Sequence, residues 1–145
     1  MTAIAWRRRL ATSLAISQLL PMYILFGLLK HLVPLRALAR LAWRDPVDGR
    51  DPERERLTVA RIVKTRRLFP LWDGDCVQKS LLLYRELSGA GADPVLAVGF
   101  RRLNGRVEGH AWILVDGVAV DDRLAADGAF TSSFSFGRRG GLIRD

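Results

Sequence analysis

The stretch "WDGDCVQKSLLLYREL", residues 72–87, joins a polar, acidic turn to an apolar helical pattern and contains the only cysteine of the chain, Cys76. The glycine of "DGD" allows a sharp entry into a helix, and Gly89 and Gly91 follow as stop signals. The pattern predicts a helix of about three turns that begins at Cys76. The exposed amides and the dipole of a helix N-terminus stabilise a thiolate, so this position suits a reactive cysteine.

The residues after this helix predict an antiparallel meander. "VLAVGF", residues 95–100, is an apolar run suited to a buried strand. "NG" at 104–105 and "DG" at 116–117 are hairpin signals. Between them, "RVEGHAWILV" (106–115) is predicted to be the central strand, and "VAVDD" (118–122) its returning partner. The second half of the chain is therefore predicted to be α+β.

The rest of the chain gives weaker signals. Residues 1 to about 70 lack strand signals and are predicted to be helical, with a polar linker at 44–56 and a helix that starts at Pro52. The tail "TSSFSFGRRGGLIRD", residues 131–145, has no clear period and is expected to be partly loose. We expect a helical region over 1–70 and a catalytic core over 71–145. In the helical region, leucines recur at helical spacing at Leu28, Leu32, Leu35, Leu38 and Leu41.

The composition indicates a globular chain of one domain with an excess of positive charge. The 145 residues make one ordinary domain, and 49% of them are hydrophobic, which is typical of a globular chain. A single cysteine excludes an internal disulfide framework and favours a reducing, cytoplasmic setting. The net charge of +8 comes mostly from arginine and predicts an acidic partner, such as a nucleic acid, an anionic membrane surface or an acidic peptide. Charge alone does not choose among these.

The segment from Leu10 to Leu29 has no charged residue and is about as long as a membrane span. Its polar residues and Pro21 make it only moderately apolar, and no small-x-small cleavage site follows it. We expect a pair of apolar helices, broken near Pro21, that bury against the domain or a partner. Membrane insertion or attachment to a membrane surface is the alternative.

Three features outside the apolar segment can combine into a catalytic site. Cys76 begins a helix, His110 lies in a predicted strand, and Asp121 and Asp122 follow a hairpin turn. Each alone is typical of an ordinary structural residue. Together they supply a thiolate, an imidazole that takes its proton, and a carboxylate that orients the imidazole. The backbone amide of Cys76 would add one donor to a developing oxyanion.

Strand geometry predicts which of the two aspartates shares a face of the sheet with His110. A tight turn at 116–117 would place His110, Trp112 and Asp121 on one face of the sheet and Asp122 on the other. A bulge or a longer loop would reverse this. Trp112, beside His110, would shield the imidazole, line a substrate cleft or belong to the core.

The residues around these positions resemble a known family. "DC" followed by "LLLYREL", then "PVLAVGFRR" and "GHAWILVDGVAVDD", is similar to the transglutaminase-like cysteine peptidases of lasso-peptide biosynthesis, in the form separated from its leader-recognition domain. The resemblance covers residues 66–123. It implies a papain-related helix and antiparallel sheet, with Cys76 as nucleophile, His110 as general base and then acid, and Asp122 as orienting carboxylate. The spacing in the family favours Asp122 over Asp121.

The resemblance also implies an activity and partners. The chain would remove the leader from a ribosomally made precursor, with a separate leader-recognition protein delivering the substrate and an ATP-using macrolactam cyclase acting on the product. It implies no cofactor and no nucleic acid, and two histidines and one cysteine far apart in sequence predict no metal site. A non-catalytic scaffold or membrane-anchoring subunit, and another transglutaminase-like acyl transferase, are the alternatives. The segment 10–29 is the expected docking surface, whether for the partner or for a membrane.

Overall fold

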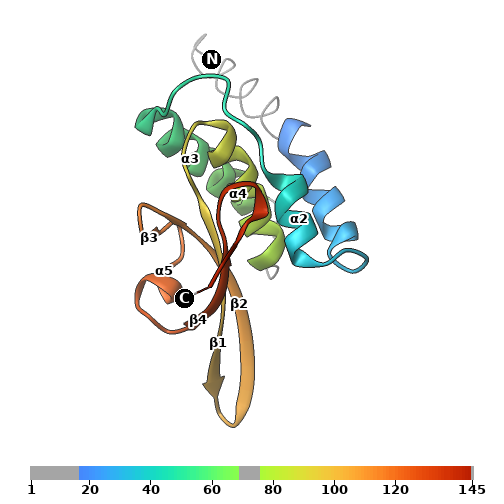
Figure 1. Cartoon of the computed structure of the whole chain (residues 1–145), viewed down its shortest axis with the longest axis vertical. Coiled ribbons are helices and arrows are strands. Elements are labelled where there is room, and N and C mark those ends of the chain that lie inside the picture. Colours follow the sequence, from blue (N-terminus) through green and yellow to red (C-terminus); the bar gives the residue numbers. More distant parts are fainter. Residues whose placement is uncertain (1–16, 69–75, 145) are drawn as a thin grey trace.

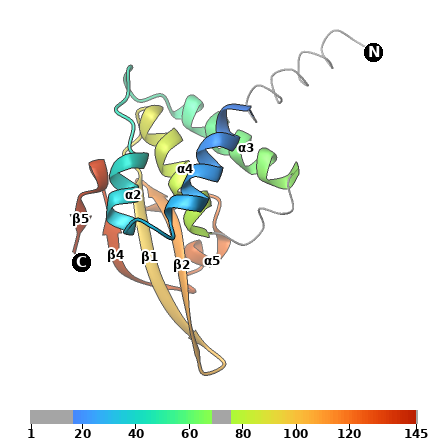
Figure 2. The ribbon, with the colours of Figure 1, turned by 90° about the vertical axis from the view of Figure 1, so that its right-hand side faces the viewer.

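The computed structural model describes residues 17–68 and 76–144. The described part is an α+β fold, as predicted, in which helices cover one side of a five-stranded antiparallel sheet (Figures 1 and 2). A helix over residues 17–29 comes first. The remaining elements are α2 (Leu35–Ala42), α3 (Pro52–Leu68), α4 (Cys76–Gly89), β1 (Val95–Leu103), β2 (Arg106–Val115), β3 (Val118–Ala119), α5 (Arg123–Ala126), β4 (Thr131–Phe136), a 3-10 turn η2 (Arg138–Gly140) and β5 (Leu142–Ile143).

The sequence signals around α4 and the two turns are confirmed. The helix begins at Cys76 and ends at Gly89, and Gly91 then takes a positive φ of 91°. Both turns use residues in the left-handed region, which Asn, Asp and Gly adopt at low cost. The β1–β2 hairpin is the longest pair in the sheet and projects beyond the body of the molecule (Figure 1).

The order of the strands differs from the prediction. The sheet runs β3-β2-β1-β4-β5, so β1 rather than β2 is the central strand. The tail expected to be loose forms β4, which pairs with β1 from Leu96↔Phe136 to Phe100↔Thr131, and β5 pairs with β4 in turn. The returning strand β3 is only two residues long. The sequence of β4 does alternate, but its pairing depends on β1, which lies about 35 residues earlier.

The helix over residues 17–29 corrects the prediction of a break at Pro21. These residues form one continuous helix through the proline. A proline inside a helix removes one backbone hydrogen bond, and burial of a long apolar face offsets that loss. Leu19, Tyr23 and Phe26 supply that face and are at most 8% exposed. One face of the helix therefore belongs to the core.

The leucines at helical spacing between residues 28 and 41 do not share one buried face. The chain turns at 30–34, and Pro34 precedes α2. Leu28, Leu32 and Leu41 are 64%, 79% and 60% exposed, whereas α2 buries Leu38, Ala39 and Ala42. The turn changes the phase of the helix, so a period carried across it no longer marks a single face.

One hydrophobic core joins the helical region and the sheet. It combines buried side chains of helix 17–29, α2 and α3 with those of α4 and the strands. Tyr84 of α4 fixes the C-terminal strands: its hydroxyl donates to the carbonyl of Gly137 and accepts from the N–H of Gly140 at 3.0 Å. Burial raises the pKa of Tyr84 to about 12, because a buried phenolate loses its hydration. The largest fully buried side chains are Tyr84, Phe26, Leu38, Leu81, Leu83, Leu87, Leu96 and Ile113.

Candidate active site

His110, in the middle of β2, forms a hydrogen-bonded pair with Asp122, which follows β3. Nε2 of His110 lies 2.6 Å from Oδ2 of Asp122, and the two side chains are 19% and 12% exposed. Asp122 is also the N-cap of α5, where its Oδ1 accepts from the backbone N–H of Ala125 at 3.0 Å. Both carboxylate oxygens are therefore held, one by the helix and one by the imidazole.

Of the two aspartates, Asp122 is the one that contacts His110. The turn at 116–117 is tight, with Val115 opposite Val118, so the regular pairing that favoured Asp121 is present at its start. The pairing ends early, because Asp121 has a φ of +49° and takes the chain out of the sheet. The left-handed conformation of Asp121 interrupts the extended strand, and the following residue, Asp122, then pairs with His110.

Asp121 has a separate partner. Nζ of Lys79, in the first turns of α4, donates to the carbonyl of Asp121 at 2.8 Å and lies 3.1 Å from its Oδ2. Lys79 is 16% exposed, so this ion pair is partly shielded from water. The contact holds the unusual backbone of Asp121 against α4.

Cys76 is the first residue of α4, is partly buried and packs against the core. One turn further on, Oγ of Ser80 donates to the carbonyl of Ala111 at 3.0 Å, and Ala111 is the neighbour of His110. Together with the Lys79–Asp121 contact, this attaches the start of α4 beside both members of the histidine–carboxylate pair. The helix that begins with the thiol thus lies against the strand that carries the imidazole.

Two aromatic rings stack on the imidazole of His110. Phe130 lies 4.7 Å away between ring centroids at 25°, and Trp112 lies 5.9 Å away at 20°. The guanidinium of Arg101 lies 4.7 Å from the centroid of Phe130 and pairs with Glu108 at 2.8 Å. Stacking on both neighbours restricts rotation of the imidazole. Phe130 gave no sequence signal, because it follows a turn and belongs to no periodic pattern.

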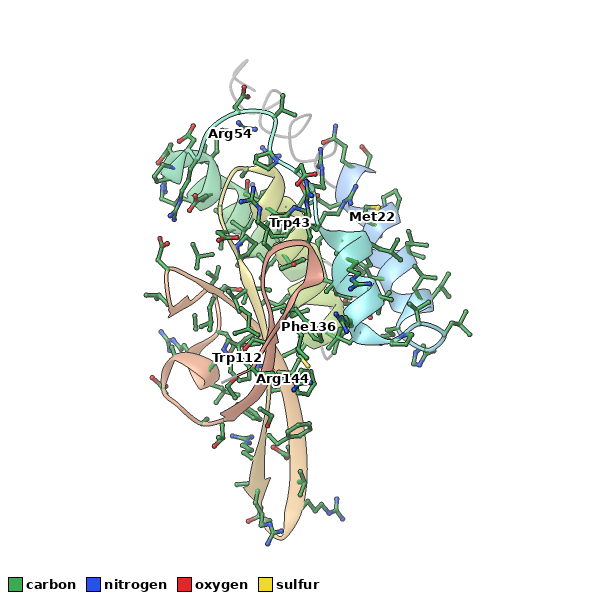
Figure 3. The ribbon with its side chains drawn as sticks, viewed as in Figure 1. Met22, Trp43, Arg54, Trp112, Phe136 and Arg144 are labelled. Carbon is green, nitrogen blue, oxygen red and sulfur yellow. The ribbon has the colours of Figure 1, made fainter. Side chains whose placement is uncertain are left out.

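Trp112 is 6% exposed and lies among the strands of the sheet, where Figure 3 labels it. Gly99, opposite His110 on β1, makes room for the indole, since a Cβ there would lie 2.7 Å from Cη2 of Trp112. A role for Trp112 in orienting His110 fits this burial. Its contact with substrate stays a prediction.

Gln78, to which the sequence assigned no role, links two helices. Its Nε2 donates to the carbonyl of Tyr23 at 3.0 Å, and Nζ of Lys30 donates to its Oε1 at 3.3 Å. Gly27 lies directly under the amide and leaves space for it. Helix 17–29 therefore contacts the second residue after Cys76. Asp75, on the other side of Cys76, lies outside the described residues.

Two further observations concern the described residues only. Residues 17–68 and 76–144 contain no group of three or more His, Cys, Asp or Glu side chains able to hold a metal ion. Within the same ranges, no helix is long and apolar enough to cross a membrane.

The arrangement can perform general base chemistry. When Nε2–H of His110 donates to Asp122, the lone pair is on Nδ1, which can accept a proton from a thiol. No described residue hydrogen-bonds to Nδ1. A carboxylate, an oriented imidazole and a thiol at a helix N-terminus are the parts that acyl transfer through a thioester requires.

Residues 19–135 match the transglutaminase-like superfamily, and the chain belongs to that superfamily. A comparison with curated proteins and with solved structures gave no match. The matched range begins two residues into helix 17–29, includes α2, α3, α4 and strands β1 to β3, and ends one residue before the end of β4. Membership is consistent with a cysteine peptidase or an acyltransferase.

Proposed function

We propose that the chain is a cysteine peptidase with Cys76 as nucleophile, His110 as general base and acid, and Asp122 as the orienting carboxylate. The observation that carries the proposal is the 2.6 Å hydrogen bond between His110 and Asp122, in a chain of the transglutaminase-like superfamily. Asp122 is itself held by the N-cap of α5, and Phe130 and Trp112 stack near the imidazole of His110, so both members of the pair are restrained. These contacts support a role for His110 as an oriented base.

The reaction has two stages. Nδ1 of His110 takes the thiol proton of Cys76, and the thiolate adds to the scissile carbonyl, whose oxygen is stabilised by the backbone amide at the start of α4. Collapse breaks the C–N bond, and the imidazolium gives its proton to the leaving amine. Water, deprotonated by His110, then hydrolyses the thioester. The products are a carboxylate on the leader and a free amine on the core peptide.

The proposed substrate is the precursor of a lasso peptide, cleaved after its leader. The basis is the similarity of "DC", "LLLYREL" and "GHAWILVDGVAVDD" to leader peptidases of that class. The freed amine is the group that a macrolactam cyclase would join to a side-chain carboxylate.

A separate leader-binding protein should deliver this substrate. Before Val95, the described residues form helices and loops, without a strand to which a leader could pair. Delivery on a partner raises the local concentration of the peptide to about the millimolar range. We expect slow cleavage of the precursor by the chain alone, and fast cleavage with the leader-binding protein added. Equal rates in the two time courses, followed by mass, would contradict delivery without affecting the triad.

The catalytic test compares Cys76→Ala and His110→Ala with His31→Ala, which changes an exposed histidine. Cleavage is followed by mass with full-length precursor and the leader-binding protein. Both site variants should lose cleavage and keep the thermal unfolding transition, and His31→Ala should cleave like the parent chain. Cleavage retained in either folded site variant would exclude this mechanism. Loss of cleavage in His31→Ala as well would point to a structural cause.

A second candidate is acyl transfer to an amine instead of water, which the superfamily match favours. The first stage is identical, and an amine then attacks the thioester. Incubation of the precursor with a primary amine separates the two functions by product mass. A leader that carries the amine would indicate a transferase, and a leader that ends in a carboxylate would indicate a peptidase.

A further inference from the structure

The charge of the chain is unevenly distributed. Residues 1–44 contain seven of the 23 basic residues and none of the 15 acidic ones. Residues 45–145 contain the other 16 basic residues and all 15 acidic ones, so they contribute only +1 to the net charge of +8. Nearly all of the excess positive charge therefore belongs to the segment that precedes α3.

The same segment exposes an apolar helix face. Ile24, Leu25, Leu28 and Leu32 are 51%, 42%, 64% and 79% exposed, and their spacing places them along one side of the helix and its following turn. The opposite side of the helix is buried in the core. We call these four residues the apolar face.

Exposed basic side chains lie on α2, the helix next to the one that carries the apolar face (Figure 2). Helix 17–29 and α2 lie side by side in front of α4 in Figure 2, so both contribute to one outer surface of the molecule. Arg36 and Arg40 lie on α2 one turn apart and are exposed, and neither forms an ion pair with a residue that the structure describes. An exposed apolar stripe with exposed arginines on the adjacent helix has the apolar and basic composition of surfaces that bind a membrane interface.

We propose that the apolar face, with Arg36 and Arg40, binds the surface of an anionic lipid bilayer without crossing it. Leucine and isoleucine side chains would enter the boundary between headgroups and acyl chains, and the arginines would contact lipid phosphates. The inference is independent of the proposed peptidase activity.

The charges favour lipid over a second copy of the chain. A symmetric dimer through this face would bring two identical basic surfaces together, with no acidic residue in residues 1–44 to compensate. An anionic bilayer attracts that surface, and each added basic residue strengthens the attraction. The apolar face also lies on an outer helix, which suits a flat interface more than a groove-binding peptide (Figure 2).

The test is flotation of the purified full chain with vesicles of phosphatidylcholine, with or without phosphatidylglycerol. We expect binding to the anionic vesicles that weakens with salt, and little binding to neutral ones. Leu28→Glu combined with Leu32→Glu should lower the partition at least about tenfold, since two leucines leave the interface. Arg36→Ser combined with Arg40→Ser should lower it about fivefold per arginine.

Matched controls exclude a general effect of charge or hydropathy. Val47→Glu adds a charge at a 95% exposed apolar residue in the linker, and Arg102→Ser with Arg106→Ser removes two exposed arginines from the hairpin. These variants, and Cys76→Ser, should bind like the parent chain. No flotation with anionic vesicles, or an equal loss in the controls, would overturn the proposal. A dimer that dissociates in the Leu28 and Leu32 variant, or a leader-binding protein that requires the same leucines while vesicles do not bind, would also overturn it.

Discussion

The two hairpins of the sheet use the same turn chemistry and have very different lengths. Asn104 and Gly105 take φ values of 50° and 75°, and Asp116 and Gly117 take 52° and 77°. The first turn joins nine paired positions between β1 and β2, and the second only two between β2 and β3. Identical turns therefore do not produce identical hairpins.

The difference arises in the chain beyond each turn. After the first turn, both strands continue, and β4 covers the other edge of β1. After the second, Asp121 turns the chain away, and the contact with Lys79 and the N-cap at Asp122 hold it there. The long hairpin supplies a rigid strand for His110. The short hairpin ends just before Asp122, whose carboxylate pairs with His110.

The largest effect should follow from replacing the carboxylate at the end of the short hairpin. Asp122→Asn keeps an N-cap residue and removes the charge that orients His110, so cleavage should fall about a hundredfold or more. Stability to heat should change little. Initial rates with saturating leader-binding protein measure the effect. A rate within a factor of a few of the parent chain would remove Asp122 from the site.

Two substitutions at Asp121 distinguish the effect of its backbone conformation from the effect of its charge. Asp121→Val disfavours the left-handed backbone by about 1–3 kcal/mol and should extend β3, which moves Asp122 away from His110. We expect a loss of stability of that order and cleavage at least about tenfold slower. Asp121→Asn tolerates the same φ and should keep most activity. If Asp121→Asn is more damaging than Asp122→Asn, the orienting carboxylate is Asp121.

The two turn glycines form a matched pair. Neither Gly105 nor Gly117 has an atom within 4 Å of the position of a Cβ, so alanine adds only the cost of a positive φ, about 1 kcal/mol at each. Chemical unfolding should show similar losses for Gly105→Ala and Gly117→Ala. Cleavage should slow only in Gly117→Ala, because only that hairpin positions Asp122. Equal slowing in both would mean that the long hairpin contacts substrate.

The smallest effect concerns the contact that holds the short hairpin to α4. Lys79→Met keeps most of the side chain and removes the ammonium that contacts Asp121. We expect cleavage to slow about two- to fivefold, the size of a partly exposed ion pair. Lys64→Met, at an exposed position of α3, is the control. A rate unchanged from that control would show that the N-cap alone fixes Asp122.

Local signals were enough for several elements. The start of α4 at Cys76 and both hairpin turns depend on neighbouring residues only, and all are present as predicted. The resemblance to leader peptidases selected Asp122, whereas regular strand alternation selected Asp121. Alternation failed because it assumes an extended backbone, and Asp121 is not extended.

Other features depended on residues far away in the chain. The periodicity of the helical region did not show which leucines face the core, because the turn at 30–34 changes the phase. The tail forms β4 because it pairs with β1. Phe130 lies against His110 because β4, which follows it directly, is held in the sheet by that pairing.

The sequence by itself determined where the helix with the thiol begins and where the chain reverses, since capping, glycine conformation and apolar runs act over a few residues. Only the tertiary structure decided which aspartate meets His110, which rings stack on it and which face of helix 17–29 stays exposed. Those outcomes are set by packing between segments distant in sequence. Three hydrogen bonds connect α4 to these distant segments: Lys79 to Asp121, Ser80 to Ala111 in the sheet, and Gln78 to Tyr23 in helix 17–29.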